Sequence, residues 1–309
     1  MNQAPRLFRL GALAFAAVLF ILSGCAPRPY RGLSEALGLP PETQCTVTPT
    51  QVKLLGGGHT LTFNRGKRPA EIDGTLYYLN TPAGMNAIAE HDLALIRQAI
   101  LCPPPAKGHA TLMLDPGHGA ADTGCRAGKT YEKHITLAVA LEVKRLLEAQ
   151  GFTILMTRDS DQHAPSLEGR ATLAAASPID GFISIHVNSA KNPEAKGIEL
   201  YTLPAPGCDG TAEHAPARAP MVGQNYLAQA TRLAFCVQRA LLASGEPKRA
   251  DRGLRHAHFK VLRDTPAPAI LIELGFLTNA QEFPLLAESA GQQRLASAIA
   301  RGLQEAFAP

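Results

Sequence analysis

From residue 110 onward, short apolar runs that end in polar residues alternate with longer segments of helical periodicity. The runs are short and rich in β-branched side chains, which predicts strands. Apolar positions that recur every three or four residues, in a segment that starts at Glu132 and stops at Gly151 and in residues 224–243, predict amphipathic helices. This alternation predicts an α/β domain over 110–309, in which helices cover a mostly parallel sheet. The predicted strands are TLMLD, FTILMTR, GFISIHVN, GIELYTL, FKVLRD and AILIELG.

Residues 44–102 follow a different pattern, in which short β-like runs are separated by turn residues. QVKLL, TLTF and TLYYL are split by GGG and by NRGKRPAEIDG, and the helical stretch EHDLALIRQAI closes the segment. We therefore predict a small β-rich accessory domain, which the Pro-rich linker 103–109 joins to the α/β domain.

The first 25 residues have the features of an export signal. Arg6 and Arg9 precede an apolar stretch of 13 residues, 10–22, which is too short to span a bilayer. It ends in LSGC, which resembles the lipobox of bacterial lipoproteins, so we expect cleavage after residue 24 and lipid on Cys25. Residues 25–43 would form a tether to the membrane. The alternatives are an ordinary secretory signal and an uncleaved anchor.

The lipobox reading also predicts where the protein resides. It would be lipid-anchored in the cell envelope, outside the cytoplasm. Alanine rather than aspartate follows Cys25, which in a Gram-negative cell favours the periplasmic face of the outer membrane.

Composition argues against a nucleic-acid partner. The formal net charge is +4 and falls to +2 without Arg6 and Arg9, and no block of basic residues stands out. Tryptophan is absent and aromatic residues make up only 6% of the chain, which leaves no stacking platform for single strands.

Export makes disulfides possible for the five cysteines that follow Cys25. Cys45 and Cys102 bracket the accessory segment, so we predict that they pair. Cys208 and Cys236 are a second, weaker candidate pair. An odd number leaves at least one thiol free or intermolecular.

Three predicted strands of the α/β domain end close to residues that suit a metal site. TLMLDPG leads into His118, GFISI into His186 and AILI into Glu273, while Glu132 opens the helix fourteen residues after His118. Ligands bind at the carboxyl ends of strands in open α/β sheets. Two histidines and a carboxylate are typical of catalytic zinc, and a second carboxylate can move the proton of the activated water. Gly117 and Gly119 would leave space beside His118 for metal and substrate.

Structural roles are the alternative for each of these residues. A histidine at a strand end can simply be part of the packing, and Glu132 can be a solvated helix start. Glu273 lies within an apolar run and would be costly to bury unpaired, so its alternative is a salt bridge to Arg158 or Arg170.

The neighbouring polar residues receive other predictions. We expect Asp122 to brace its loop, and His134 to face away from the site. Cys125 is a minor candidate for a thiolate ligand. His256 and His258 could line a substrate groove. Arg158 and Arg170 fit structural pairs with Asp159, Asp161 or Asp180.

The ordered set of motifs resembles the zinc-dependent N-acetylmuramoyl-L-alanine amidases of the type 3 family over residues 110–306. It comprises LDPGHGAADTG, YEKHITLAVALEVKRLLEAQGF, TRDSD, GRATLAAA, DGFISIHVNSA, GIELY and AILIELGFLTNAQE. By family position, the resemblance implies zinc ligands at His118, Glu132 and His186 and a catalytic carboxylate at Glu273. Ala120 and Ala121 stand where the family usually has a second glycine, a departure that affects the loop alone.

The resemblance implies an enzyme that cuts peptidoglycan between N-acetylmuramic acid and the L-alanine of the stem peptide. The alternatives are a non-catalytic wall-binding lipoprotein and a zinc carboxypeptidase or deacetylase that acts on the wall. Some related amidases carry a helix that plugs the site. The loop 204–223 is short and broken by prolines, so we expect neither a plug nor a protein activator.

Overall fold

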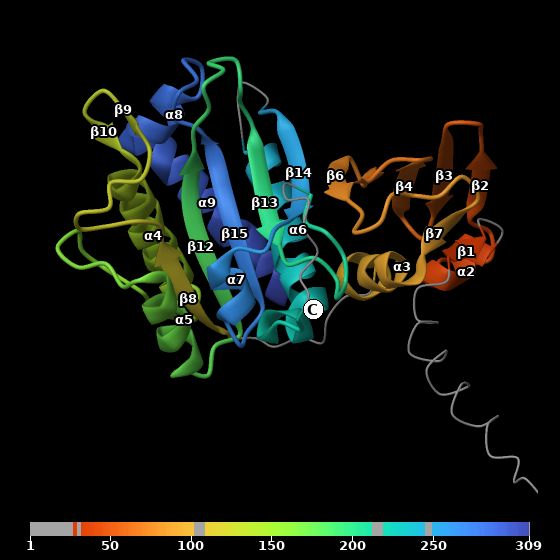
Figure 1. Cartoon of the computed structure of the whole chain (residues 1–309), viewed down its shortest axis with the longest axis horizontal. Coiled ribbons are helices and arrows are strands. Elements are labelled where there is room, and N and C mark those ends of the chain that lie inside the picture. The colour runs from red at the N-terminus through yellow and green to blue at the C-terminus, as the bar shows by residue number, and fades with distance from the viewer. Residues whose placement is uncertain (1–26, 30–31, 102–108, 212–218, 245–248, 309) are drawn as a thin grey trace, which may run out of the picture.

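The computed structural model describes residues 27–29, 32–101, 109–211, 219–244 and 249–308 (Figure 1). The predicted signal peptide, Cys25 and Cys102 lie outside these ranges, so the lipid anchor stays a prediction. Cys45 is an exposed free thiol, so the predicted Cys45–Cys102 disulfide is wrong. None of the helices in the described ranges is both long and apolar enough to cross a membrane.

The α/β part of the chain contains a mixed, mostly parallel sheet, as predicted (Figure 1). The first four strands in spatial order are parallel, β13 is antiparallel to β15, and β14 is parallel to β13. In that order they are β11 (Thr153–Met156), β8 (Thr111–Pro116), β12 (Gly181–Asn188), β15 (Ala269–Phe276), β13 (Ile198–Thr202) and β14 (Asp251–His256).

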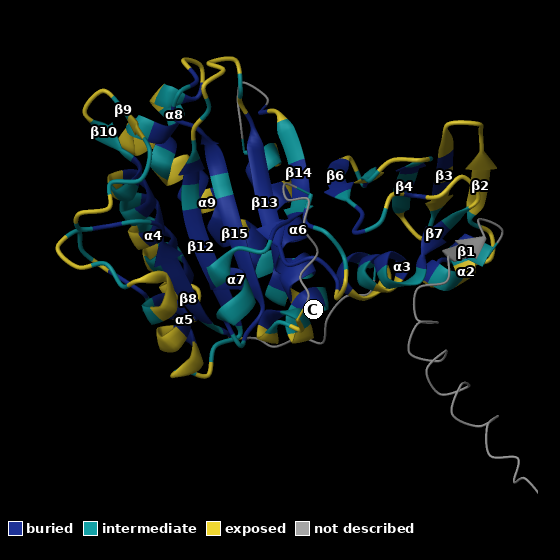
Figure 2. Cartoon of the chain, in the orientation of Figure 1, coloured by how far each residue is buried: buried dark blue, intermediate teal, exposed yellow. Residues whose placement is uncertain are grey.

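Helices cover both faces of this sheet, so the central strands β8, β12, β15 and β13 are mostly buried (Figure 2). One face packs on α4 (Glu132–Glu148), α6 (Leu227–Ala243) and α9 (Ser289–Phe307). The other packs on α5 (Leu167–Ala175) and α7 (Lys260–Asp264). Shorter elements complete the domain: β9 (Arg126–Ala127), β10 (Thr130–Tyr131), the 3-10 helix η4 (Val222–Tyr226) and α8 (Phe283–Ala287).

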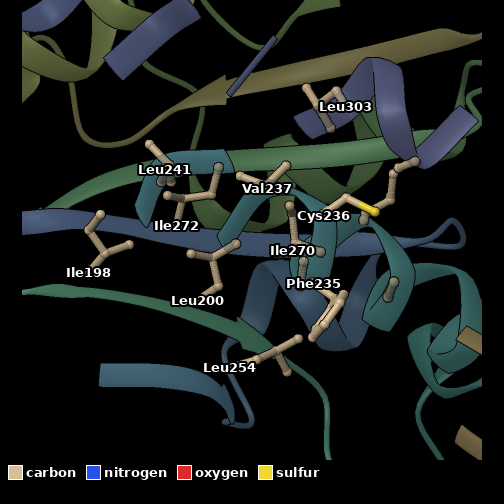
Figure 3. Packing of buried hydrophobic residues seen from close by; sticks show 14 of the residues in the cluster. Ile198, Leu200, Phe235, Cys236, Val237, Leu241, Leu254, Ile270, Ile272 and Leu303 are labelled. Atoms are coloured by element: carbon tan, nitrogen blue, oxygen red, sulfur yellow. The ribbon is translucent and has the colours of Figure 1, made fainter. Parts of the chain in front are cut away.

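The larger core cluster forms where α6 and α9 meet the sheet. Ile270 and Ile272 of β15 point toward Val237 of α6 and are fully buried, and Leu303 of α9 lies beside them (Figure 3). Removing such a side chain from water stabilises the fold by about 1.5–3 kcal/mol. This packing holds the strand ends rigidly in place.

Strand alternation determines which polar side chains share a face. Leu271 packs in the cluster under α5 and α7, so Glu273, two residues later, lies on that same face. Phe182 belongs to the same cluster, which puts His186, four residues later, on this face too. His186 and Glu273 are direct neighbours in the register of β12 and β15. The sheet therefore delivers both side chains to one spot.

The accessory region continues the same sheet. Its strands form an antiparallel meander from β2 to β6, and β6 joins β14 with Tyr77 opposite Leu254. The buried side chains of both regions form one continuous apolar cluster. The meander strands are β2 (Gln44–Val47), β3 (Gln51–Gly56), β4 (His59–Asn64), β5 (Pro69–Ile72) and β6 (Thr75–Tyr78).

Short elements before and after the meander close the accessory region. β1 (Pro27–Pro29) pairs with β7 (Ala87–Ala89), and α2 (Leu33–Leu37) buries both of its terminal leucines. The predicted helix at the end of the segment is present as α3 (Glu90–Ile96), which continues as the π-helix η3 (Arg97–Leu101). Much of the predicted tether, residues 25–43, is therefore packed against the accessory strands.

Polar contacts reinforce the junction of β6 and β14. Asp251 accepts a hydrogen bond from the Leu76 amide at 2.7 Å, and the Arg255 guanidinium stacks over the Tyr78 ring at 4.7 Å. His256 is buried, with Nε2 donating to the Tyr78 carbonyl at 2.7 Å and Nδ1 at 3.1 Å from the Thr202 hydroxyl. It is therefore a structural histidine and not part of a substrate groove.

The junction predicts a pH-dependent loss of stability. Burial lowers the pKa of His256 from about 6.5 to about 4, so on acidification the unfolded chain takes up this proton first. The stability that the neutral ring provides is complete above about pH 6.5 and is lost as pH falls toward 4. We expect about 2 kcal/mol less stability at pH 5 than at pH 7.5 from this residue.

Urea unfolding of the wild type, His256→Gln and the exposed control His134→Gln at these two pH values checks this prediction. The pH-dependent difference should shrink in His256→Gln only. Equal differences in all three proteins would contradict it.

Two predictions about this part of the chain are wrong. FKVLRD forms the short helix α7 rather than a strand, and the strand of that region is the preceding β14, whose polar sequence gave no strand signal. Short runs with two or three apolar residues fit either a strand or a helix turn. Cys208 and Cys236 are both free thiols, so they do not form a disulfide.

Candidate metal centre

The loop after β8 has an unusual backbone conformation. His118 and Ala120 have φ values of +61° and +50°, and Gly119 has +127°. Non-glycine residues rarely adopt positive φ, and such conformations cluster at functional sites. The loop turns sharply at the carboxyl end of the buried strand, which lets the His118 ring face the centre.

Two glycines allow the loop to contact its neighbours closely. A Cβ on Gly117 would lie 2.4 Å from Cε1 of His186. A Cβ on Gly124, which has a φ of +63°, would lie 2.5 Å from Oε2 of Glu132. The space that we expected Gly117 to leave for a metal is filled by the His186 ring.

A buried ion pair supports the loop from below. Asp115 binds Arg170 through a charge-assisted hydrogen bond, and both side chains are almost fully buried. Asp115 also accepts hydrogen bonds from Thr157 at 2.6 Å and Ser184 at 2.7 Å. Arg170 donates further to the carbonyl of His118 at 2.9 Å. The predicted partners of Arg170 were therefore wrong, because Asp115 takes that place.

Arg158 holds the same loop through backbone carbonyls. It donates to Pro116 at 3.1 Å, to Gly117 at 2.9 Å and to Lys133 at 2.8 Å. The predicted partner Asp161 binds Lys133 at 2.7 Å instead. Neither arginine is paired with Glu273 in the described structure, so the salt-bridge alternative for Glu273 is wrong.

The structure brings His118, Glu132 and His186 together at this end of the sheet. Oε1 of Glu132 lies 3.2 Å from Nε2 of His118 and 3.1 Å from Nδ1 of His186. One donor atom from each residue lies within 4.8 Å of the others. Two ligands of a tetrahedral zinc ion at 2.0–2.1 Å are separated by roughly 3.3 Å, so the spacing and donor types fit zinc.

Hydrogen bonds orient these three groups. Nδ1 of His118 donates to Asp122 at 2.8 Å, which leaves Nε2 free to bind a metal, and confirms the bracing role predicted for Asp122. The second oxygen of Glu132 accepts from the Cys125 amide at 2.8 Å. Burial raises the pKa of Glu132, but hydrogen bonds and charge from His118 and His186 outweigh it and hold that pKa well below its usual range.

Glu273 has the opposite electrostatic environment. Burial first, and then the negative charges of Glu132 and Glu199, raise its pKa well above the usual range. Its Oε2 atom is shielded from solvent and has no hydrogen-bond partner among the described residues. A carboxyl group without a partner in such a place is suited to hold and move a proton.

Comparison with known proteins identifies the family. Residues 112–305 match the Amidase_3 family, N-acetylmuramoyl-L-alanine amidase. The chain belongs to this family. It is 34% identical over 228 residues to the amidase AmiC of Neisseria meningitidis, which covers 65% of this chain and 55% of that protein. The chain thus spans about half the length of this relative.

Two further amidases are similar over a larger share of their own length. The amidase AmiA of Escherichia coli is 31% identical over 254 residues, which covers 74% of this chain and 87% of that protein. The solved structure of AmiC2 of Nostoc punctiforme is 31% identical with a TM-score of 0.53, covering 63% of this chain and 95% of that chain. These matches confirm the α/β fold and the amidase family expected from the motifs.

The centre opens into a cleft of about 730 Å³, which we call the catalytic cleft. His118, His186 and Glu273 all line it. Its walls come from the segment before α5 and from α7, with Leu167 and Phe259 among the apolar side chains. A substrate in this cleft would contact the metal ligands and Glu273 together.

The remaining candidates fall outside the centre. Burial, with the charge of Glu132, raises the pKa of the Cys125 thiol to about 12, and its Sγ donates to the Val187 carbonyl at 3.2 Å. A protonated thiol is a poor metal ligand. His134 lies on the exposed side of α4, 3.3 Å from Asp161, as predicted. Sequence reasoning missed Asp115, whose place at the end of an apolar strand was the available signal.

Removing the brace on His118 should weaken metal binding. Asp122→Ala deletes both the 2.8 Å contact to His118 and the hydrogen bond to the Gly124 amide. We expect zinc affinity to fall about 10–100-fold, as for other carboxylate partners of metal-binding histidines. Competition with a chromophoric chelator measures this. Asp159→Ala, which changes an acid outside the centre, is the control, and equal affinities in both variants would contradict the brace.

Proposed function

We propose that the protein is a zinc-dependent peptidoglycan amidase. It hydrolyses the amide between the lactyl group of N-acetylmuramic acid and the L-alanine of the stem peptide. His118, Glu132 and His186 hold the metal, and Glu273 is the catalytic carboxylate. The supporting observation is the convergence of these three donors beside an unpartnered, shielded carboxyl group, in a chain of the amidase family.

The chemistry that zinc supplies when bound is polarisation of the scissile carbonyl and activation of a water molecule. Glu273 lines the cleft, so its carboxylate can accept a proton from the attacking water. The raised pKa of this carboxyl lets it keep that proton until the tetrahedral intermediate collapses. Glu273 then donates the proton to the leaving nitrogen of L-alanine, so that the amide bond breaks and a free amine departs.

The support beneath the loop has a function in this scheme. Arg170 and Arg158 fix the carbonyls of Pro116, Gly117 and His118, so that the loop cannot drift when substrate enters. A centre held by buried hydrogen bonds keeps its ligand atoms in place before the metal and the substrate arrive.

The predicted export signal supports activity at the cell wall. Arg6, Arg9 and the LSGC motif support removal of residues 1–24 and lipid attachment at Cys25. The enzyme would act on peptidoglycan from the membrane surface of the cell envelope. Labelling with a radioactive fatty acid tests the anchor, because wild type should carry label and Cys25→Ser should not.

The bond that is cut is tested by digesting purified peptidoglycan and analysing the products by mass spectrometry. An amidase releases intact stem peptides and leaves glycan without peptide. Shortened stems still attached to the glycan would indicate a carboxypeptidase, and loss of acetyl groups would indicate a deacetylase. Binding to the wall without any released product would support the non-catalytic alternative.

A further inference from the structure

A second hollow, which shares no lining residue with the catalytic cleft, lies beside the metal centre. It has a volume of about 670 Å³, and we call it the basic groove. Gly124 and Cys125 line it, and both directly contact Glu132, because the Cys125 amide donates to Glu132 and Gly124 lies against its carboxylate. The basic groove therefore adjoins the metal centre through the two residues that contact Glu132.

Two cations from separate segments of the chain line the basic groove. Arg126 belongs to the β9–β10 hairpin, and Lys191 follows β12 in the loop that leads to β13. The hairpin lies at the same end of the domain as α8, at the top of the view in Figure 1. Both side chains are exposed, and neither has a hydrogen bond or an ion pair within the described part of the chain. Unpaired cations facing one groove favour a negatively charged occupant.

The catalytic cleft has a different charge pattern. Its acids Asp115, Asp122 and Glu273 outnumber its two cations, and both cations are already engaged. Arg170 is paired with Asp115, and Lys260 lies 2.8 Å from Asp264. The described lining of the basic groove contains no carboxylate. The two hollows beside the centre therefore select for different chemistry.

The substrate of the proposed reaction has the same asymmetry. On the acyl side of the scissile amide lies a sugar, whose C–H faces can pack on apolar walls such as Phe259 and Leu167. On the amine side lies a peptide with free carboxylates. From this match we infer that the basic groove binds the stem peptide, with Arg126 and Lys191 contacting its carboxylates, while the glycan lies in the catalytic cleft. This inference rests on the proposed function and assigns the orientation of the substrate in it.

Kinetics with two soluble substrates test the orientation. One carries the full stem peptide with its carboxylates on the muramoyl group, and the other carries L-alaninamide, which has none. For Arg126→Ala/Lys191→Ala we expect the KM for the first substrate to rise roughly tenfold with kcat unchanged, as for the loss of two solvent-exposed ion pairs. The KM for L-alaninamide should stay the same. Arg126→Glu/Lys191→Glu should raise the first KM further.

Lys129→Ala is the matched control, because Lys129 is exposed on the same hairpin but does not line the groove. It should leave both substrates unaffected. Equal losses on both substrates, or no change on either, would overturn the orientation while leaving the amidase activity of the wild type intact. Failure of the wild-type enzyme to release peptide from both substrates would instead overturn the proposed function, and the inference with it.

Discussion

Replacing Glu273 with glutamine is expected to reduce kcat for peptidoglycan hydrolysis by about 10³-fold, within the usual range for loss of a general acid–base group. Glutamine has nearly the same shape but cannot accept or release the proton. The three metal-binding groups are untouched, so zinc content should equal that of the wild type. Release of soluble peptide measures the rate, and atomic absorption of the purified protein measures the zinc.

The control for this variant is Glu168→Gln, an exposed carboxylate of α5 beside the catalytic cleft. It should keep the wild-type rate. If Glu273→Gln retained more than a tenth of the activity, the proton would be moved by another group. If the Glu273→Gln variant lost zinc as well as activity, Glu273 would itself be a metal ligand rather than a neighbour of the ligands.

The location of the centre could be predicted because each strand that leads to it is a short apolar run with a clear end. Each buried run ends at a definite residue, and the ends of parallel strands meet at one edge of the sheet. That reasoning identified His118, His186 and Glu273. Glu132 could be predicted because it opens the helix that begins at this edge of the sheet, where its side chain can point back toward the strand ends. The register of β12 and β15 places His186 beside Glu273.

What supports the centre could not be predicted in the same way. Arg170 meets Asp115 across 55 residues of sequence, and no local pattern distinguishes Asp115 from Asp161 as its partner. Pairing of this kind is decided by which side chains the sheet and helices bury together. Sequence could indicate that the arginines would be paired, but not with which groups.

The accessory region shows a similar limit. Strands β3, β4 and β6 were recognisable from their alternation and turn residues, whereas β2 was not indicated and β5 was hidden in a turn-like sequence. Whether they would form a separate unit depends on an edge contact between β6 and β14. Because β14 is a polar strand that the pattern did not indicate, the continuous sheet could not be foreseen.

Gly117→Ala is expected to disrupt the metal centre through steric contact alone. The new methyl group would lie 2.4 Å from Cε1 and 2.6 Å from Nδ1 of His186. The backbone cannot yield, since the Gly117 amide donates to Ile185 at 2.9 Å and its carbonyl accepts from Arg158 at 2.9 Å. The His186 ring must therefore move away from Glu132, and we expect zinc affinity and hydrolysis to fall about 100-fold or more.

Gly169→Ala is the matched control, because it adds the same methyl group to α5 at the edge of the cleft. There the nearest atom is Cβ of Pro165 at 3.2 Å, and alanine is the better residue for a helix. Zinc affinity should be unchanged. Measuring zinc affinity, activity and thermal stability for both variants separates the effects, since a Gly117→Ala protein that lost stability but kept its zinc would show that His186 tolerates displacement. In that case the close contact between Gly117 and His186 would matter for packing and not for holding the metal ligand.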